Sequence, residues 1–388
     1  MLISDVKTYV TMPIQGLPWL FVEVHTDEGV TGVGECTLYT ANHILSQGVE
    51  AVKPLIVGLD PANIEEIWQR IFRHYLRIGA RGIISAVVSA IDIALWDIKG
   101  KVLGVPIYQL LGGAVRDHVP LYTHVQDASY PNVTPDDAVK LALQTQADGY
   151  QAIKTDPFKS ARIRSGPYQG ASMTEKLNPA MIREAVDWVS ALRDALGPYY
   201  ELMVDAHARF EVSSAIKAAR AMEHLDLNWF EEPVPPESYP ALKEFRENTN
   251  IPVSVGESLF TRYDFVPIFE QRLADFVMPD VAWTGGISEL RRIAAQAEAY
   301  YVPFSPHDAL GPVAISAAFQ VCMATPNLYR QECLHTWFKD FPKVIKPMFD
   351  YHDGAIWPND RPGLGIELDH DGVAEYALDP KSPEANRM

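Results

Sequence analysis

Hydrophobic positions along the chain follow two different rhythms, which separate a short N-terminal part from a longer central part. Near the N-terminus, the β-rich runs at 19–26 and 30–37 are separated by a turn-like Asp-Glu-Gly, which predicts two adjacent antiparallel strands. Farther on, apolar residues recur at the spacing of one helix face between Ile84 and Leu95. These signals predict a compact α+β domain over residues 1–117.

Between residues 118 and 350, short apolar runs of strand length alternate with stretches of helical character. The runs lie at 119–125, 150–156, 201–205, 227–231, 252–257, 274–280, 301–307 and 327–332. From the third run onward each run ends in a polar residue, and successive polar residues are 26, 26, 23, 27 and 25 positions apart. Such even spacing predicts repeated strand–helix units, eight of which close into a parallel barrel. An open doubly wound sheet is the alternative, but no glycine-rich GxGxxG segment follows an early strand.

Most of the polar residues at these run ends are acids. The full set of polar residues is Asp205, Glu231, Glu257, Asp280, His307 and Glu332. Because each helix of a barrel returns the chain to the opposite end, all strand ends meet at one rim, and we expect these side chains to converge. Three successive carboxylates repel one another unless a cation neutralises them, and an oxygen-only set favours Mg²⁺ over zinc. We therefore predict that Asp205, Glu231 and Glu257 bind Mg²⁺.

Further polar side chains near the run ends are each open to two interpretations. A carboxylate beside a histidine fixes the tautomer of the ring and raises its basicity, as Asp280 could for His307, although a lone histidine also occurs at helix caps and surfaces. Lys154, at the end of the second run, is either a surface lysine or an ammonium that stabilises negative charge on an oxygen. His207 shares a strand face with Asp205, because side chains two positions apart point the same way. It is either a proton carrier beside a metal ligand or an ordinary polar residue at a strand end.

The composition excludes several classes of partner. The 388 residues carry a formal net charge of −17, which is unsuited to nucleic acid or to an anionic membrane surface. The three cysteines form no CxxC pattern, so neither a disulfide framework nor a zinc–thiolate site is expected. No apolar run approaches the ~18 residues that span a bilayer, and the first residues show no basic stretch followed by a long apolar run. We expect a cytoplasmic protein.

Several segments resemble those of a known family. They are IDIALWDIKGKVLGVPIYQLLGG, WFEEPVPPE, VGESLFTRYDF, MPDVAWTGGISE and PHDALGP, and they are similar to the enolase superfamily on its mandelate racemase side. Within that group the chain most resembles sugar-acid dehydratases of the D-galactonate dehydratase type. The resemblance implies an N-terminal capping domain, residues 1–117, over a modified (β/α)7β barrel, residues 118–350. Residues 351–388 break the strand–helix pattern and are expected to pack back on the capping domain.

The resemblance also implies a chemistry: Mg²⁺-assisted abstraction of the proton α to a carboxylate, through an enediolate. By resemblance, Asp205, Glu231 and Glu257 match the metal ligands, with Glu231 rather than Glu232 as the ligand of the FEEP segment. His307, oriented by Asp280, matches the general base, and Glu332 matches the acid that hydrogen-bonds the carboxylate of the substrate.

Two positions favour a dehydratase over a racemase. The racemases of this group resemble one another in a Lys-x-Lys pair on the second strand. Here Lys154 is present, but Asp156 stands at the position of the second lysine. The galactonate-type dehydratases place an Asp-x-His on the third strand, and Asp205 and His207 fit that pattern. The histidine would protonate the departing β-hydroxyl, which is a poor leaving group without a positioned acid.

We therefore expect dehydration of an aldonate-type sugar acid to a 2-keto-3-deoxy acid, with Lys154 and Mg²⁺ stabilising the enediolate. An epimerase, racemase or cycloisomerase on the same scaffold is one alternative, and a catalytically silent binding protein is another. The resemblance suggests a homo-oligomer and points to residues 12–19 and the loops for substrate selection. The long interval 157–180 is expected to form a flap over the rim.

Overall fold

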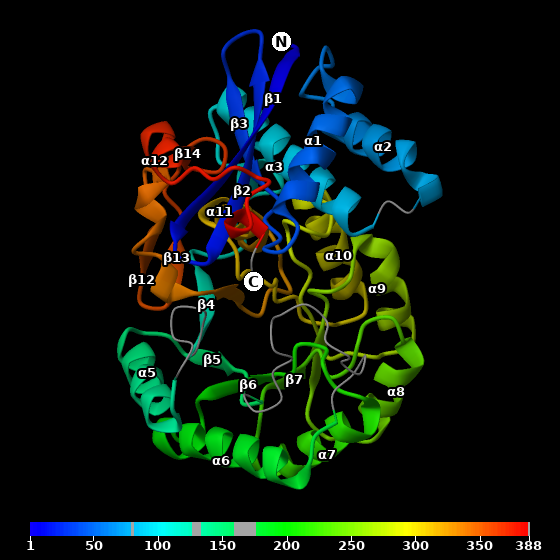
Figure 1. The fold of residues 1–388 in the computed structure, drawn as a ribbon, viewed down its shortest axis with the longest axis vertical. Helices are drawn as coiled ribbons and strands as arrows, with labels where there is room; N and C mark the ends of the chain where they lie inside the picture. The colour runs from blue at the N-terminus through cyan, green and yellow to red at the C-terminus, as the bar shows by residue number, and fades with distance from the viewer. Residues whose placement is uncertain (79–80, 126–132, 159–175, 387–388) are drawn as a thin grey trace.

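The computed structural model describes residues 1–78, 81–125, 133–158 and 176–386. An antiparallel sheet with its helices occupies one end of the molecule, and a ring of strands and helices occupies the other (Figure 1). Most of the interval 157–180, predicted to form a flap, lies outside the described residues. Within the described part of the chain, no helix combines the length and the apolar character needed to cross a membrane.

The N-terminal domain is a three-stranded antiparallel sheet covered by helices, as the alternating pattern predicts. Its elements are β1 Ile3–Ile14, β2 Leu17–Thr26, β3 Thr31–Glu35, α1 Asn42–Ile56, α2 Ile64–His74, α3 Ile83–Leu103 and the short α4 Ile107–Leu110. Helix α3 contains the predicted apolar face and packs directly on β3. A Cβ atom on Gly34 would lie 1.9 Å from the carbonyl oxygen of Ala90, so only glycine permits this close approach.

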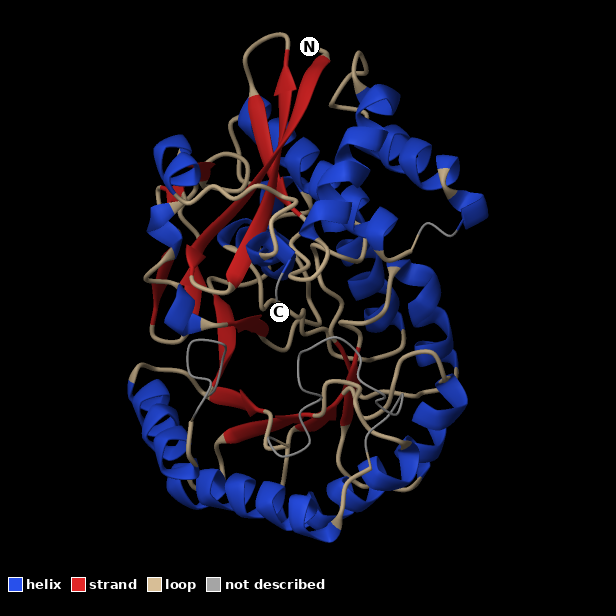
Figure 2. Ribbon diagram, viewed as in Figure 1, coloured by secondary structure: helices blue, strands red, loops and turns tan. Residues whose placement is uncertain are grey.

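The central part is a parallel barrel whose helices lie outside its strands (Figure 2). The strands are β4 Val119–His124, β5 Ala152–Thr155, β6 Glu201–Asp205, β7 Trp229–Glu231, β8 Val253–Val255, β9 Phe276–Val277 and β10 Gln331–Cys333. The helices between them are α5 Pro135–Ala147, α6 Pro179–Leu196, α7 Val212–Met222, α8 Tyr239–Glu247, α9 Thr261–Glu270, α10 Gly286–Ala299 and α11 Pro312–Met323. Strands β4 to β9 pair in chain order, and β10 pairs with β4 on its other side. The fold is therefore α/β, a modified (β/α)7β barrel with an N-terminal capping domain.

The seventh predicted strand, 301–307, is much reduced. Phe304 alone bridges to Val277 on one side and to Leu328 on the other, which closes the ring. Pro303 and Pro306 flank it, and a proline has no N–H to donate to a ladder. The expectation of a full strand there is wrong for this reason.

The C-terminal segment contacts both the barrel and the capping domain. Strands β12 Asp350–His352 and β13 Ala355–Trp357 form a hairpin, and β13 pairs antiparallel with β4 of the barrel. Strand β14 Glu367–Leu368 pairs with β11 Ile345–Lys346, and α12 His370–Glu375 follows. Beyond α12 the chain does reach the capping domain, where the Leu378 amide donates to the carbonyl of Val10.

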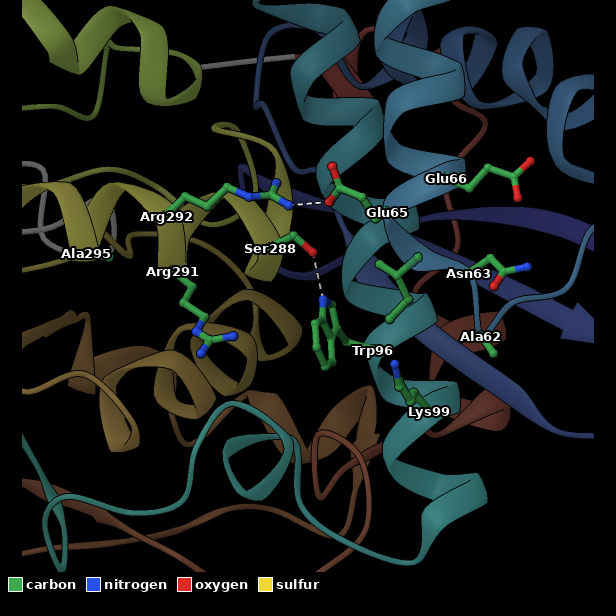
Figure 3. A pocket seen from close by; sticks show the side chains of 11 residues that line it. Ala62, Asn63, Glu65, Glu66, Trp96, Lys99, Ser288, Arg291, Arg292 and Ala295 are labelled. Atoms are coloured by element: carbon green, nitrogen blue, oxygen red, sulfur yellow. Dashed lines mark hydrogen bonds and ion pairs between the residues drawn. The ribbon is translucent and has the colours of Figure 1, made fainter.

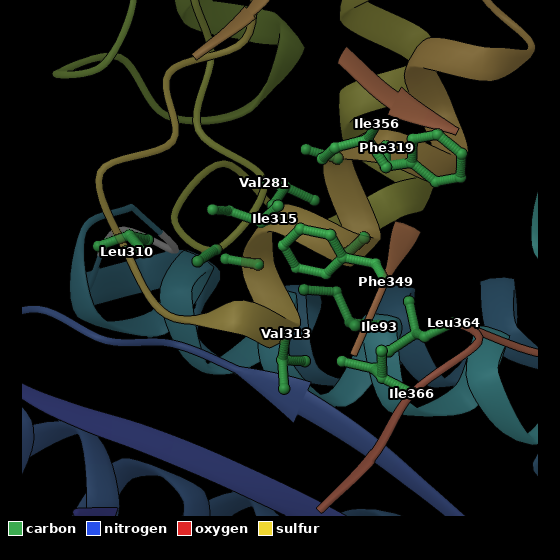
Figure 4. Close-up of a cluster of buried hydrophobic side chains, with 14 of the residues drawn as sticks. Ile93, Val281, Leu310, Val313, Ile315, Phe319, Phe349, Ile356, Leu364 and Ile366 are labelled. Carbon is green, nitrogen blue, oxygen red and sulfur yellow. The ribbon is translucent and has the colours of Figure 1, made fainter. Parts of the chain in front are cut away.

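One hydrophobic cluster joins these parts (Figure 4). Its members include Ile93 of α3, Val313 and Ile315 of α11 and Ile356 of β13. Because these residues come from the capping domain, the barrel and the C-terminal hairpin, their burial fixes the cap over the barrel.

Candidate metal centre and acid–base site

The interior of the barrel explains why the polar residues converge. Its apolar filling is a small buried cluster of Tyr122, Ala152, Met203, Trp229 and Met278. The residues two positions farther along each strand or strand end are His124, Lys154, Asp205, Glu231 and Asp280. Since side chains alternate along a strand, each polar residue shares the inward face of its apolar neighbour, one layer nearer the C-terminal strand ends.

Asp205, Glu231 and Glu257 form the cluster expected to bind a metal. Asp205 and Glu231 are direct register partners in the β6–β7 pair, and one carboxylate oxygen of each of the three residues lies within 4.8 Å of the others. Burial, together with the charge of Asp205, raises the pKa of Glu231 well above its usual value. Such a group of acids is costly to bury without a cation.

The donor set fits a hard divalent ion. Asp205 Oδ2 is buried, and no hydrogen bond reaches it from the described residues, although the Lys154 Nζ and His207 Nε2 atoms lie 3.3 and 3.4 Å away. A buried oxygen that accepts no hydrogen bond, beside two further carboxylates, fits a ligand of a cation. Three carboxylates with no thiolate or imidazole among them suit Mg²⁺.

Lys154 lies in the same buried layer rather than at the surface. Its Nζ atom is 2.6 Å from Glu332 Oε1 and also pairs with Glu231. Burial acts to lower the pKa of Lys154, but the charges of Glu231 and Glu332 outweigh it and raise this pKa well above its usual value. The side chain therefore stays a cation between the acidic cluster and Glu332.

His307 and Asp280 form the expected pair. The His307 Nδ1 and Asp280 Oδ2 atoms are 2.6 Å apart, and the other Asp280 oxygen accepts the amide of Ala282 at 2.7 Å. The His307 Nε2 atom lies 3.1 Å from Glu257 Oε2 and 3.9 Å from Glu332 Oε2. Burial acts to lower the pKa of His307, but these acids, led by Glu332, raise it well above its usual value.

Trp283 of the barrel connects this histidine to the capping domain. The two rings lie 5.2 Å apart, and the indole Nε1 donates to the carbonyl of Thr37 at 2.7 Å. The Thr37 hydroxyl donates in turn to Glu35, which also accepts the amide of Gly311 at 2.8 Å. Burial raises the pKa of Glu35 to about 7. These contacts attach the capping domain to the segment that carries His307.

His207 is the most exposed of these acid–base groups, with 44% of its side chain accessible. Both His207 and Ala208 adopt left-handed backbone angles, with φ of 50° and 53°, and the His207 amide donates to Asp205 Oδ1 at 2.7 Å. This tight turn directs the Nε2 atom of the ring toward Asp205. Burial opposes the charged ring, but Asp205 and Asp156 raise the pKa of His207 to about 9.

Sequence reasoning missed one residue of the site, His124. Its Nε2 atom is 2.5 Å from Glu332 Oε1, and the β4–β5 register pairs it directly with Lys154. The first apolar run, 119–125, ends in Val125, so its end carried no polar signal. The alternation of side chains along this run did contain a signal, because His124 lies two positions after the inward-facing Tyr122.

The structure also contains a cavity of about 660 Å³ away from the strand ends (Figure 3). It lies between α2, α3 and α10, with Lys99, Arg291 and Arg292 among its lining residues. Arg292 pairs there with Glu65, and the indole of Trp96 donates to Ser288 at 2.8 Å. None of the acid–base residues described above lines this cavity.

Two family models match the chain in succession. Residues 7–112 match the mandelate racemase / muconate lactonizing enzyme N-terminal domain, and residues 137–372 match the enolase C-terminal domain-like model. The two matches together span most of the capping domain and the barrel.

Individual relatives agree with the family models over nearly the full chain. A D-galactonate dehydratase family member from Streptomyces bingchenggensis is 35% identical, over 97% of this chain and 94% of its own. A D-xylonate dehydratase from Haloferax volcanii is 32% identical, over 97% and 89%. The crystal structure of a mandelate racemase/muconate lactonizing enzyme-like protein from Rubrobacter xylanophilus superposes with a TM-score of 0.87 at 33% identity, over 97% of this chain and 98% of that one. The chain belongs to the enolase superfamily, in its mandelate racemase / muconate lactonizing enzyme group.

Proposed function

We propose that this chain is a Mg²⁺-dependent acid-sugar dehydratase that converts an aldonate to a 2-keto-3-deoxy acid. The observation that carries the proposal is the pair of imidazoles beside the acidic cluster. The His307 Nε2 atom contacts Glu257, whereas the His207 Nε2 atom contacts Asp205. One imidazole can therefore remove a proton and the other can deliver one at the same bound substrate. Two relatives support this substrate class, because their names, D-galactonate dehydratase family member and D-xylonate dehydratase, both refer to acid sugars.

The first step is removal of the proton on carbon 2 by His307 Nε2. The electron pair of the C2–H bond becomes the C1–C2 double bond of an enediolate, and negative charge develops on the oxygens of the substrate carboxylate. Asp280 holds the ring through Nδ1 and stabilises the imidazolium that forms. A Mg²⁺ ion held by Asp205, Glu231 and Glu257 would stabilise the developing charge as a Lewis acid.

Lys154 and Glu332 are the remaining groups around the substrate carboxylate. The Lys154 ammonium supplies a fixed positive charge where the enediolate forms. Glu332 lies against Lys154 and His124, at 2.6 and 2.5 Å. We assign it to hydrogen bonding with the carboxylate of the substrate, a role in which Glu332 must carry the shared proton, because an ionised carboxylate only accepts hydrogen bonds.

The second step is loss of the hydroxyl on carbon 3. The enediolate pair moves to form the C2–C3 double bond, the C3–O bond breaks, and the His207 Nε2 proton joins the departing oxygen to give water. The resulting enol takes a proton at carbon 3 and becomes the 2-keto-3-deoxy acid. Without an acid the leaving group would be hydroxide, so His207 decides between elimination and simple exchange.

A screen of acid sugars tests the proposal. The full chain is incubated with Mg²⁺ and each member of an aldonate library, and 2-keto acid is assayed. At least one member should give a 2-keto-3-deoxy acid. If no member yields a 2-keto acid, the proposed function is wrong.

The variant His207→Asn separates the two steps. We expect it to lose about 10²–10⁴-fold in the rate of water loss, the usual contribution of a general acid. Exchange of the C2 proton in D₂O should continue, because His307 and Asp280 are unchanged. Recovered substrate is analysed by NMR for deuterium at carbon 2, and product by 2-keto acid assay. Dehydration at the wild-type rate in this variant would remove His207 from the mechanism.

A further inference from the structure

Asp156 is the residue that replaces the second lysine of a Lys-x-Lys pair, and the proposed function leaves it without a role. It directly follows β5, whose last residue is Thr155. Its side chain is 11% exposed, so the carboxylate is largely removed from solvent. A carboxylate in such a place needs partners, and the described residues include Arg209, Phe158 and His207 among them.

The partners divide between the two oxygens of Asp156. Oδ1 accepts the guanidinium of Arg209 at 2.7 Å and the backbone amide of Phe158 at 3.0 Å. Oδ2 lies 3.3 Å from the Nδ1 atom of His207. Arg209 is itself anchored, because its Nε donates to the carbonyl of Ala206 at 3.1 Å. One oxygen thus fixes the carboxylate, and the other faces the imidazole.

The ring of His207 is consequently held between two carboxylates. Nδ1 faces Asp156, and Nε2 faces Asp205 of the acidic cluster at 3.4 Å. The left-handed turn at His207 and Ala208 fixes the backbone from which the side chain starts, whereas the last torsion of a histidine has only a broad intrinsic preference. Because 44% of the side chain is exposed, packing alone does not prevent that rotation.

A carboxylate that accepts from Nδ1–H fixes both the tautomer and the orientation of a histidine. The pair Asp280–His307 shows the same arrangement on the other imidazole of the site, at 2.6 Å. The two histidines would then each have a carboxylate behind Nδ1 and a transferable proton position at Nε2.

We propose that Asp156 is a positioning residue that, held by Arg209, orients His207 so that Nε2 presents its proton to the departing hydroxyl. This role rests on the proposed dehydratase function and deepens it. Asp156 does not touch the reacting atoms. It determines whether the enediolate goes forward by losing water or returns to substrate by taking up a proton at carbon 2.

The test compares wild-type protein with Asp156→Asn, each as the full chain with Mg²⁺. It measures how the enediolate partitions between loss of water and return to the substrate. The substrate is an acid sugar that the wild-type protein dehydrates. We expect the variant to lose about 10–100-fold in kcat for water loss, the usual effect of removing such a supporting partner. Its KM should stay within about twofold, and deuterium exchange at carbon 2 should persist, so that exchange per turnover rises.

Two further variants make the result specific. The double variant Asp156→Asn/His207→Asn should be no slower than His207→Asn alone, because the two residues act as one unit. Asp275→Asn removes a carboxylate paired with Arg246 at 2.7 Å, just before β9 and away from the C-terminal strand ends, and should leave the partition unchanged. Equal losses of exchange and dehydration in Asp156→Asn, or a change in KM alone, would overturn the proposal.

A readout that does not depend on turnover separates this inference from the proposed function. In ¹⁵N-histidine-labelled protein with Mg²⁺, the His207 ring, assigned by its loss in His207→Asn, should be protonated at Nδ1. In Asp156→Asn the Nδ1 signal of this ring should shift, because the carboxylate that accepts from Nδ1–H has become an amide. Unchanged ring signals would contradict the role of Asp156, whereas the expected shift in a protein that dehydrates no acid sugar would refute only the proposed function.

Discussion

Replacing His307 by asparagine should abolish both dehydration and exchange of the C2 proton. His307 is the buried imidazole held by Asp280 at 2.6 Å, with its Nε2 atom directed at the acidic cluster. Asparagine can still bond to Asp280, but it has no basic nitrogen. Since both outcomes begin with the same abstraction, both should fall together, by at least about 10²–10⁴-fold. Exchange is measured by NMR on substrate recovered from D₂O, and dehydration by the 2-keto acid assay.

The matched control is His352→Asn. His352 lies on the exposed hairpin strand β12, and its ring stacks on Trp357. This variant should keep wild-type exchange and dehydration. Thermal unfolding of His307→Asn checks that its fold is retained. If the folded His307→Asn protein exchanged the C2 proton at the wild-type rate, another group would be the base.

Removal of divalent metal should have a comparably large effect. The three acids of the cluster lie within 4.8 Å of one another, and Asp205 keeps a buried oxygen without a hydrogen bond from the described residues. A bound divalent ion stabilises developing charge by several kcal/mol, which corresponds to a loss of about 10³-fold on chelation. EDTA-treated protein should lose dehydration and regain it when Mg²⁺ is added back. Full activity of demonstrably metal-free protein would exclude a metal-dependent mechanism.

Neighbouring glutamates allow the ligand assignment itself to be tested. Glu231→Gln should weaken Mg²⁺ binding, measured by titration calorimetry, by at least tenfold because an anionic ligand is lost. Glu232 lies next in the chain but accepts the amide of Gly256 at 2.7 Å, and burial raises its pKa to about 8. Glu232→Gln should therefore bind Mg²⁺ almost as well as the wild-type protein. If Glu232→Gln instead bound Mg²⁺ more weakly than Glu231→Gln, Glu232 would be the metal ligand and Glu231 would not.

Periodicity made the barrel and most of its rim predictable. The even spacing from Asp205 to Glu332 reflects one strand and one helix per unit, and strand alternation explains the inward layer that contains Lys154 and Asp280. The prediction of a full seventh strand was wrong because prolines interrupt the hydrogen-bonding pattern there. Pro303 and Pro306 reduce the seventh strand to a bridge at Phe304.

Contacts between distant segments were not predictable from the chain alone. His124 joins the site because β10 pairs with β4 and brings Glu332 beside it. The place of β13 beside the first residues of β4 depends on the same kind of long-range pairing. The contact between Asp156 and His207 depends on a left-handed turn after β6. No local pattern in the sequence specifies such a turn at non-glycine residues.

The most direct test of the central claim is the mass and labelling of the product formed in D₂O from an acid sugar that the Mg²⁺-loaded protein consumes. Early in the reaction, the product should have lost the elements of one water and should carry one solvent deuterium in place of a hydrogen at carbon 3, as elimination followed by ketonisation requires. An isomer that has lost no water and carries deuterium at carbon 2 would instead show epimerisation, and it would contradict the assignment of His207 as the acid that completes a dehydration.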